Sequence, residues 1–114
     1  MVTRTADLKK IIDQYRHELE YRGIKAEKII LYGSYAIGHQ HAGSDIDLII
    51  ISSDLMKMNP IKKMEILSLA TAKIGEPIEA LGYSPKDIKE KGDDSIFWDI
   101  VMKTGKTVYD RAKR

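Results

Sequence analysis

The chain contains no cysteine and no long apolar run, and each absence excludes a class of protein. Without cysteine there is no disulfide bond and no thiolate metal ligand. No stretch approaches the roughly 20 apolar residues that a membrane-spanning helix needs. The opening residues, MVTRTADLKK, also lack the apolar core of a secretory signal. We therefore expect a cytoplasmic protein that does not bind membranes.

An excess of charge of one sign is missing as well. The 19 Lys and Arg residues are nearly balanced by 17 Asp and Glu residues, which gives a net charge of +2. Proteins that bind nucleic acid concentrate their basic residues, so direct binding to nucleic acid is not expected. A chain of 114 residues with 43% apolar residues has room for one core, which predicts a single domain over residues 1–114.

The apolar residues alternate between helical and strand spacing along the chain. A first helix is predicted to begin at Thr5 or Asp7 and to continue to about Arg22. Pro60 suits the first turn of a second helix, which ends near Ile74. Shorter helices are predicted over 84–92 and 93–105, and a brief helix or loop over 34–40. Strands are predicted over 26–34, 43–52, 76–84 and 106–110. This order predicts an α/β (α+β) fold, a small mixed β-sheet with helices packed on it.

Two expectations concern burial in these elements. The apolar run after Asp47 predicts a central strand that is covered on both faces. In the last predicted helix, we expect Ile96, Phe97, Ile100 and Val101 to lie on one side. Since Phe97 and Trp98 are adjacent, they cannot both face the same core. One of them is expected to be exposed, which would suit a surface that contacts a partner.

The stretch LYGSYAIGHQHAGSDIDLIIIS, residues 31–52, begins like a phosphate-binding loop. Gly33 and Gly38 have the spacing of a P-loop, but His39 and Gln40 stand where its Lys and Ser or Thr would be. Gly33 and Ser34 remain as a pair at the end of a strand, where glycine permits close backbone approach and a helix start favours phosphate. The alternative is that the pair forms only a turn.

Asp45 and Asp47 in the same stretch suggest a cation site. Side chains alternate along a strand, so the two carboxylates point to the same side. Like charges on one face repel each other, and a divalent cation such as Mg²⁺ or Mn²⁺ with hard oxygen ligands removes that conflict. The alternative is that Ser44 and Asp45 form a turn and that Asp47 is a surface acid.

Glu79 is the third acid of interest. It lies in the middle of a predicted strand, between Ile78 and Ala80, where an acid is disfavoured. If that strand lies beside the one that carries Asp47, the three acids form a cluster. A water-facing acid on an edge strand is the alternative reading, and Glu76, just before Pro77, is a competing candidate.

Other polar residues have simpler interpretations. His39 and His41 form an H-x-H pair, but no third His or Cys ligand is nearby, so we expect solvated loop residues and not a zinc site. Lys62 and Lys63 are expected on a solvated helix face.

Gly33-Ser34, ten intervening residues, then Asp45-Ile46-Asp47, with an acid on a later strand, resembles the DNA polymerase β-type nucleotidyltransferase superfamily. More narrowly, it resembles the minimal nucleotidyltransferases (MNT), the antitoxin half of HEPN–MNT toxin–antitoxin pairs, whose signature is G-S-x10-D-x-D. The match runs from about Ile29 to the GKTVYD segment. One departure is Glu79, which stands where the family usually has Asp and is one methylene longer.

The resemblance implies a polymerase β-like fold and an enzyme that transfers AMP from MgATP to a hydroxyl acceptor. It implies that Gly33 and Ser34 hold the triphosphate, and that Asp45, Asp47 and Glu79 are catalytic and bind two Mg²⁺ ions, or Mn²⁺. The chain leaves no room for an acceptor domain, so a partner would supply the acceptor in a homo- or hetero-oligomer. The family makes that partner a HEPN toxin, adenylylated on a tyrosine. A binding-only antitoxin and an aminoglycoside-type nucleotidyltransferase with a separate acceptor-binding chain are the alternatives.

Overall fold

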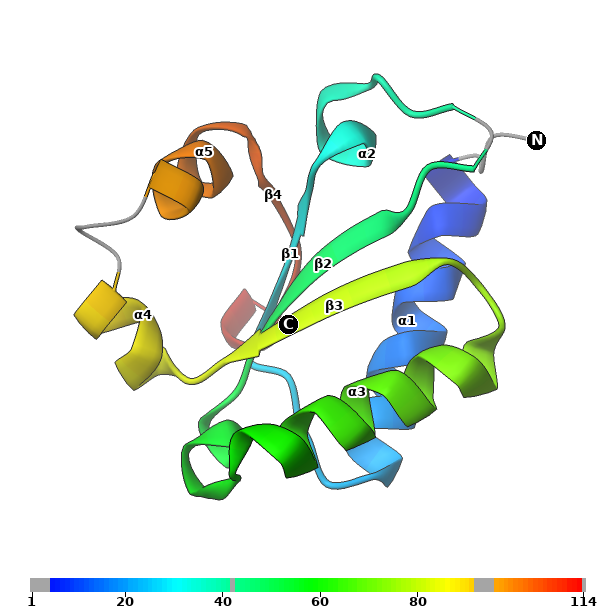
Figure 1. The fold of residues 1–114 in the computed structure, drawn as a ribbon. Helices are drawn as coiled ribbons and strands as arrows, with labels where there is room; N and C mark the ends of the chain where they lie inside the picture. Colours follow the sequence, from blue (N-terminus) through cyan, green and yellow to red (C-terminus); the bar gives the residue numbers. More distant parts are fainter. Residues whose placement is uncertain (1–4, 42, 92–95, 114) are drawn as a thin grey trace.

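The computed structural model describes residues 5–41, 43–91 and 96–113, and its elements follow the predicted order (Figure 1). Short connections join most of them, as is usual in a compact α/β unit. The helices are α1 (Thr5–Tyr21), α2 (Ser34–Ile37), α3 (Pro60–Ile74), α4 (Pro85–Lys91) and α5 (Ile96–Thr104), with two 3₁₀ helices, η1 (Ser53–Lys57) and η2 (Arg111–Lys113). The strands are β1 (Lys28–Tyr32), β2 (Ile46–Ile51), β3 (Ile78–Tyr83) and β4 (Lys106–Asp110).

The four strands form one mixed sheet in the order β3-β2-β1-β4. Strand β1 pairs antiparallel with β2 and with β4, whereas β2 and β3 are parallel. Parallel neighbours need a crossover connection, and α3 supplies it between β2 and β3. The mixed sheet with packed helices confirms the predicted fold class.

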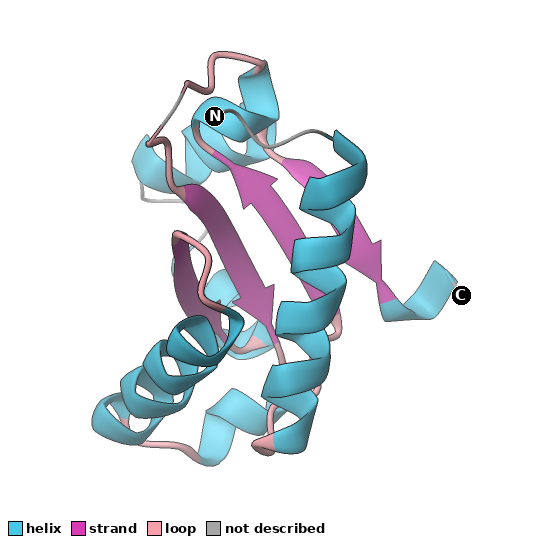
Figure 2. Ribbon diagram, turned by 90° about the vertical axis from the view of Figure 1, so that its right-hand side faces the viewer, coloured by secondary structure: helices cyan, strands magenta, loops and turns pink. Residues whose placement is uncertain are grey.

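The two faces of the sheet are covered unequally. Helices α1 and α3 cover one face, and Figure 2 shows them in front of the strands. The larger core lies there, and it includes Ile46, Leu48 and Ile50 of β2. The alternate residues Ile49 and Ile51 point to the opposite face, where a smaller core forms with Trp98 and Val101 of α5. Strand β2 is therefore buried from both sides, as its apolar run predicts.

The start of α3 follows from local sequence, and its contact with the sheet does not. Pro60 occupies the first turn, and the Asn59 side chain accepts a hydrogen bond from the Lys62 amide at 2.8 Å. Lys63 donates from Nζ to the Gly82 carbonyl of β3 at 2.9 Å, so the expectation of a solvated lysine pair is wrong for this residue. Its alkyl stem packs on the edge of the sheet while its charge satisfies a backbone acceptor.

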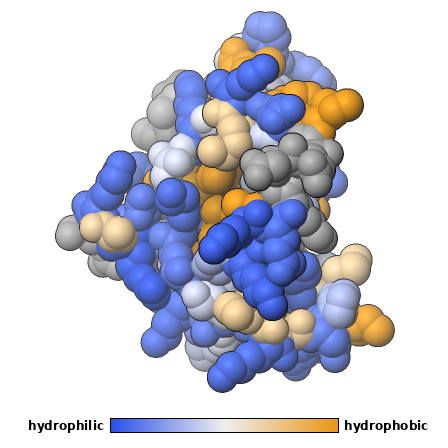
Figure 3. Space-filling model, turned by 90° about the vertical axis from the view of Figure 1, so that its left-hand side faces the viewer, coloured by the Kyte–Doolittle hydropathy of each residue, from blue (hydrophilic) through white to orange (hydrophobic). Residues whose placement is uncertain are grey.

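Helix α5 turns a different side to the sheet from the predicted one. Trp98 and Val101 are buried, whereas Ile96 is 79% exposed and Phe97 is 36% exposed. The core on this face of the sheet is small, and only Trp98 and Val101, three residues apart on the helix, pack into it. The expectation that one of the two adjacent aromatics is exposed is confirmed. On this side of the molecule, apolar side chains form separate patches among hydrophilic ones (Figure 3).

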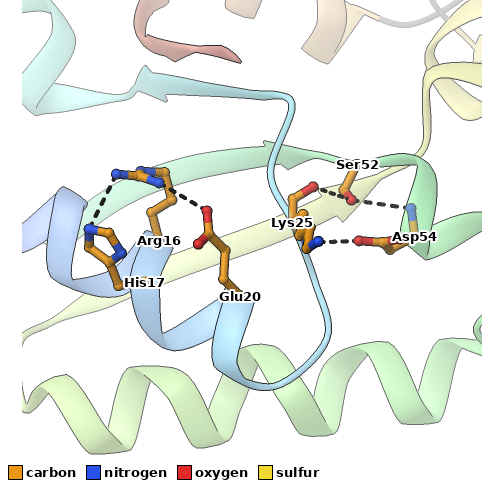
Figure 4. Close-up of polar contacts among 6 residues, drawn as sticks. All are labelled: Arg16, His17, Glu20, Lys25, Ser52 and Asp54. Atoms are coloured by element: carbon orange, nitrogen blue, oxygen red, sulfur yellow. Dashed lines mark hydrogen bonds and ion pairs between the residues drawn. The ribbon is translucent and has the colours of Figure 1, made fainter. Parts of the chain in front are cut away.

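Polar contacts fix the segment between α1 and β1. The Lys25 amide donates to Asp54 at 2.8 Å, and the Ser52 hydroxyl donates to the Lys25 carbonyl at 2.6 Å (Figure 4). Earlier in α1, Arg16 forms an ion pair with Glu20 at 2.9 Å. The first two contacts hold η1 and the end of β2 to the segment between α1 and β1, and the ion pair lies within α1. None of the described helices combines the length and apolar character needed to cross a membrane.

Candidate active site

Three neighbouring strands place one side chain of the candidate site each in a line across the sheet. Tyr32 of β1 is the register partner of Asp47 of β2, and Asp47 is the register partner of Glu79 of β3. Register partners point to the same face of a sheet. Ile46 and Leu48 point into the larger core, so Asp47, which stands between them in β2, points to the opposite face. That face is the less covered one, on which α5 lies. Asp45 precedes β2 by one residue and is solvent-exposed.

We call Asp45, Asp47 and Glu79 the carboxylate row, because their charges act on one another. Burial raises the pKa of the Asp47 carboxyl, and the negative charges of Glu79 and Asp45 raise it further. None of the three acids forms an ion pair with a lysine or arginine within residues 5–41, 43–91 and 96–113. The row is therefore a concentration of negative charge that no described cation balances.

Gly33 brings the turn after β1 directly against this row. Its backbone has φ +74° and ψ −155°, a region that essentially only glycine occupies. A Cβ atom at Gly33 would overlap Oδ2 of Asp47 and stand 3.1 Å from its Cγ. Only a residue without a side chain therefore allows the carboxylate to approach the turn so closely. Ser34, the next residue, begins α2.

Hydrogen bonds fix both ends of the loop between α2 and β2, which leads to Asp45. The His41 amide donates to the Ser44 hydroxyl at 2.8 Å, and the Ser44 amide donates back to the His41 carbonyl at 2.9 Å. Such a reciprocal pair closes a tight turn just before β2. His39 donates from its amide to the Ser34 carbonyl at 3.0 Å, at the other end of the loop.

The acid that stands beside Asp47 is Glu79 and not Glu76. Glu76 precedes Pro77 and lies outside β3, and its carbonyl accepts a hydrogen bond from the Ile78 amide at 2.7 Å. Parallel pairing of β2 with β3 brings Glu79 into register, as the position of an acid inside an apolar strand suggests. The assignment of catalytic roles to these residues remains a prediction.

A divalent cation fits the row by chemistry. Carboxylate oxygens are the ligands that Mg²⁺ and Mn²⁺ prefer, and such an ion would relieve the repulsion at Asp47. As placed, no three His, Cys, Asp or Glu side chains in the described part of the chain are arranged to hold an ion. Asp45 and Glu79 are exposed, and exposed side chains change rotamer readily. The donors are therefore of the right kind, and they sit on side chains that can turn toward an ion.

Tyr32 is the residue of this site that sequence reasoning missed. Burial, followed by the charges of Asp47 and Glu79, raises the pKa of its phenol to about 12. The sequence signal was its place directly before Gly33 at the end of a predicted strand, and the register of β1 with β2 shows that it shares a face with Asp47. Residue type alone gives no such signal, because a tyrosine at a strand end is usually a packing residue.

Comparisons with known proteins identify the family and the fold. The family model described as "Polymerase beta, Nucleotidyltransferase" matches residues 8–114. No curated protein matches the chain in sequence. A solved structure from Sulfolobus solfataricus, assigned to the nucleotidyltransferases, is 19% identical, with a TM-score of 0.66 over 93% of this chain and 83% of that one.

Two further solved structures come from toxin–antitoxin complexes. One was crystallised with AMP-PNP; it is 20% identical, with a TM-score of 0.61 over 90% of this chain and 73% of that one. The other holds a tri-AMPylated Shewanella oneidensis HEPN toxin with an MNT antitoxin; it is 18% identical, with a TM-score of 0.54 over 93% and 71% of the two chains. At these identities the likeness shows a shared fold. Because the family model covers nearly the whole sequence, the chain belongs to the polymerase β nucleotidyltransferase family.

Proposed function

We propose that this chain transfers a nucleoside monophosphate, AMP from ATP, to a tyrosine hydroxyl of a HEPN-type toxin. The observation that carries the proposal is the close approach of Gly33 to Asp47, with Glu79 in register beside Asp47. A turn for the triphosphate and a row of acids for the reacting phosphate are thereby adjacent. Both are needed for nucleotidyl transfer, and neither alone would suggest it.

Each residue has a distinct part in the proposed reaction. Gly33 and Ser34 hold the triphosphate through backbone and hydroxyl groups, and Asp45 and Asp47, with Glu79, supply oxygen ligands for Mg²⁺. When bound, the metal would neutralise charge on the phosphates and on the departing pyrophosphate. Glu79 also accepts the proton of the acceptor hydroxyl. Of the two acids of the row that lie within a strand, Asp47 and Glu79, it is the more exposed.

The acceptor comes from another molecule in this proposal. Asp45 and Glu79 are exposed, and Asp47 is half-buried, so an incoming hydroxyl can reach the row from solvent. The nature of that molecule is suggested by the similar fold found beside an AMPylated HEPN toxin. A toxin silenced in this way would make the chain an antitoxin.

A second candidate is an antitoxin that acts by binding alone. It is favoured by Glu79, which is one methylene longer than the aspartate that is usual in the family. An extra methylene shifts the carboxylate by about 1 Å, and a displacement of this size can cost on the order of 100-fold in rate.

Intact mass spectrometry separates the two candidates. The chain is incubated with MgATP and its co-expressed HEPN partner, and a matched reaction uses the Asp45→Asn, Asp47→Asn double variant. Transfer predicts partner molecules heavier by whole AMP groups, and only in the reaction with the unchanged chain. If the partner keeps its mass but loses toxicity on binding, the transfer proposal is wrong and the binding-only function is right.

A further inference from the structure

Tyr32 carries a hydroxyl next to both parts of the proposed nucleotide site. It is the last residue of β1, it directly precedes Gly33, and it shares a sheet face with Asp47, its register partner. Glu79 lies one strand further on the same line. Tyr32 is therefore next to both the turn proposed to hold the nucleotide and the acids proposed to act on it.

The ring of Tyr32 is held in place by α5. Phe97 meets it edge to face, with ring centroids 5.5 Å apart and an interplanar angle of 87°. Phe97 in turn contacts Trp98, at 5.9 Å between centroids, and Trp98 is buried. An aromatic chain of this kind limits the orientations of the tyrosine ring.

The surroundings of the hydroxyl agree with this placement. Strand register sets Tyr32 beside Asp47, and Glu79 lies next to Asp47 on the same face of the sheet. The side chain is half-buried, so the hydroxyl is also partly shielded from water. A shielded hydroxyl on the same sheet face as Glu79, the proposed base, resembles the acceptor of the proposed reaction.

We propose that Tyr32 is a nucleotidyl acceptor within the chain itself, which rests on the proposed transferase function. The Tyr32 oxygen attacks the α-phosphorus of the bound nucleoside triphosphate and forms a new oxygen–phosphorus bond. The bond from the α-phosphorus to the bridging oxygen breaks, and pyrophosphate departs with the electron pair. The phenol proton passes to the Glu79 carboxylate. The product is an O-nucleotidyl tyrosine, and no oxidant or further reactant is needed.

Such a modification would regulate the site. A nucleotide attached to Tyr32 occupies the space that a new triphosphate and a partner hydroxyl need. Self-modification is therefore expected when no partner fills the acceptor position, and the modified chain is expected to lose transfer to the partner. The hydroxyl of the partner and the hydroxyl of Tyr32 in the chain itself compete for the α-phosphate of one bound nucleotide.

The test incubates the chain alone with MgATP and measures its intact mass, followed by peptide mapping. The expected result is one added nucleotidyl group per chain, on Tyr32, and the same adduct on a fraction of the chain as purified. Tyr32→Phe removes only the hydroxyl and should abolish the adduct. Tyr83→Phe and Tyr21→Phe are the matched controls, and both should keep it, because Tyr83 lies at the far end of β3 and Tyr21 is 86% exposed at the end of α1.

Two outcomes overturn the proposal while leaving the transferase function intact. One is a chain that modifies its partner but gains no mass itself in the absence of the partner. The other is an adduct that maps to a residue other than Tyr32 or persists in Tyr32→Phe. A chain that modifies neither itself nor its partner overturns both proposals, so the two failures are distinguishable. Circular dichroism of each variant verifies that it is folded.

Discussion

Replacing Gly33 by alanine tests the contact on which the candidate site depends. The new methyl group would stand in a backbone region that costs a non-glycine residue about 1–3 kcal/mol. It would also overlap the Asp47 carboxylate, which must move away. We expect Gly33→Ala to remain folded, to lose about 1–3 kcal/mol of unfolding free energy plus the cost of the displaced carboxylate, and to lose transfer by on the order of 100-fold or more.

Gly75→Ala is the matched control for backbone strain. Gly75 ends α3 with φ +76° and ψ +18°, and a Cβ atom there meets nothing within 4 Å. The substitution costs about 1–2 kcal/mol for the left-handed backbone alone, and it lies away from the row. Denaturant unfolding should therefore show a smaller loss than for Gly33→Ala, and the rate of transfer should be unchanged.

A double-mutant cycle isolates the contact itself. In an Asp47→Ala background the carboxylate is gone, so Gly33→Ala should cost less stability there than in the unchanged chain, by about 0.5–3 kcal/mol for residues in contact. Equal costs in the two backgrounds, together with a loss no larger than that of Gly75→Ala, would refute the close approach of turn and carboxylate.

Other consequences of the row can be measured separately. ATP should bind more tightly with Mg²⁺ than with EDTA in calorimetry, because unbalanced carboxylates repel a triphosphate; equal affinities would remove the metal site. Asp45→Asn with Asp47→Asn should abolish transfer and raise the melting temperature, since a like-charge pair is relieved; an unfolded variant would make the acids structural. Glu79→Gln should lower the rate of transfer by roughly two to four orders of magnitude with little change in ATP affinity. Glu79→Asp shows whether the acid that is usual in the family gives a higher rate. Full activity of Glu79→Gln would make Glu76 the candidate for the third acid of the site. The pKa of Asp47 is raised in the folded chain from 3.8, so the folded state binds more protons there than the unfolded state, and stability should fall as pH rises from 3.8 through the raised pKa. The free energies of unfolding of the wild type and of Asp47→Asn, plotted against pH, should diverge over that range and differ by a constant amount above it. A constant difference at every pH would contradict the raised pKa.

Local sequence was informative where one residue type has few structural uses. The run Ile-Asp-Leu-Ile-Ile-Ile predicts a strand buried on both faces, and β2 is that strand. An acid inside the apolar strand β3 suggested a site, and parallel pairing with β2 placed Glu79 in register with Asp47. In both strands the sequence pattern was enough for the prediction, because side-chain alternation fixes which residues of a strand share a face.

Tertiary contacts decided what the sequence left open. Helical periodicity gives the relative directions of side chains but not which side meets the sheet, so Ile96 was expected beside Val101 and Trp98 was buried in its place. The bond from Lys63 to the Gly82 carbonyl depends on how α3 lies along β3, and no local pattern encodes it. Tyr32 became visible only when strand register placed it opposite Asp47.

The lysine on α3 has a consequence for association between molecules. Strand β3 is at the edge of the sheet, and an exposed edge with unpaired backbone groups invites strands from other chains. The Tyr83 carbonyl accepts from Ser52 of the neighbouring segment, so the Gly82 carbonyl points outward, and Lys63 covers it with a charged group. A further strand could add there only by displacing the ammonium group. The strand that carries Glu79 is thus kept terminal, which protects the chain against edge-to-edge aggregation and leaves that flank of the row open to solvent.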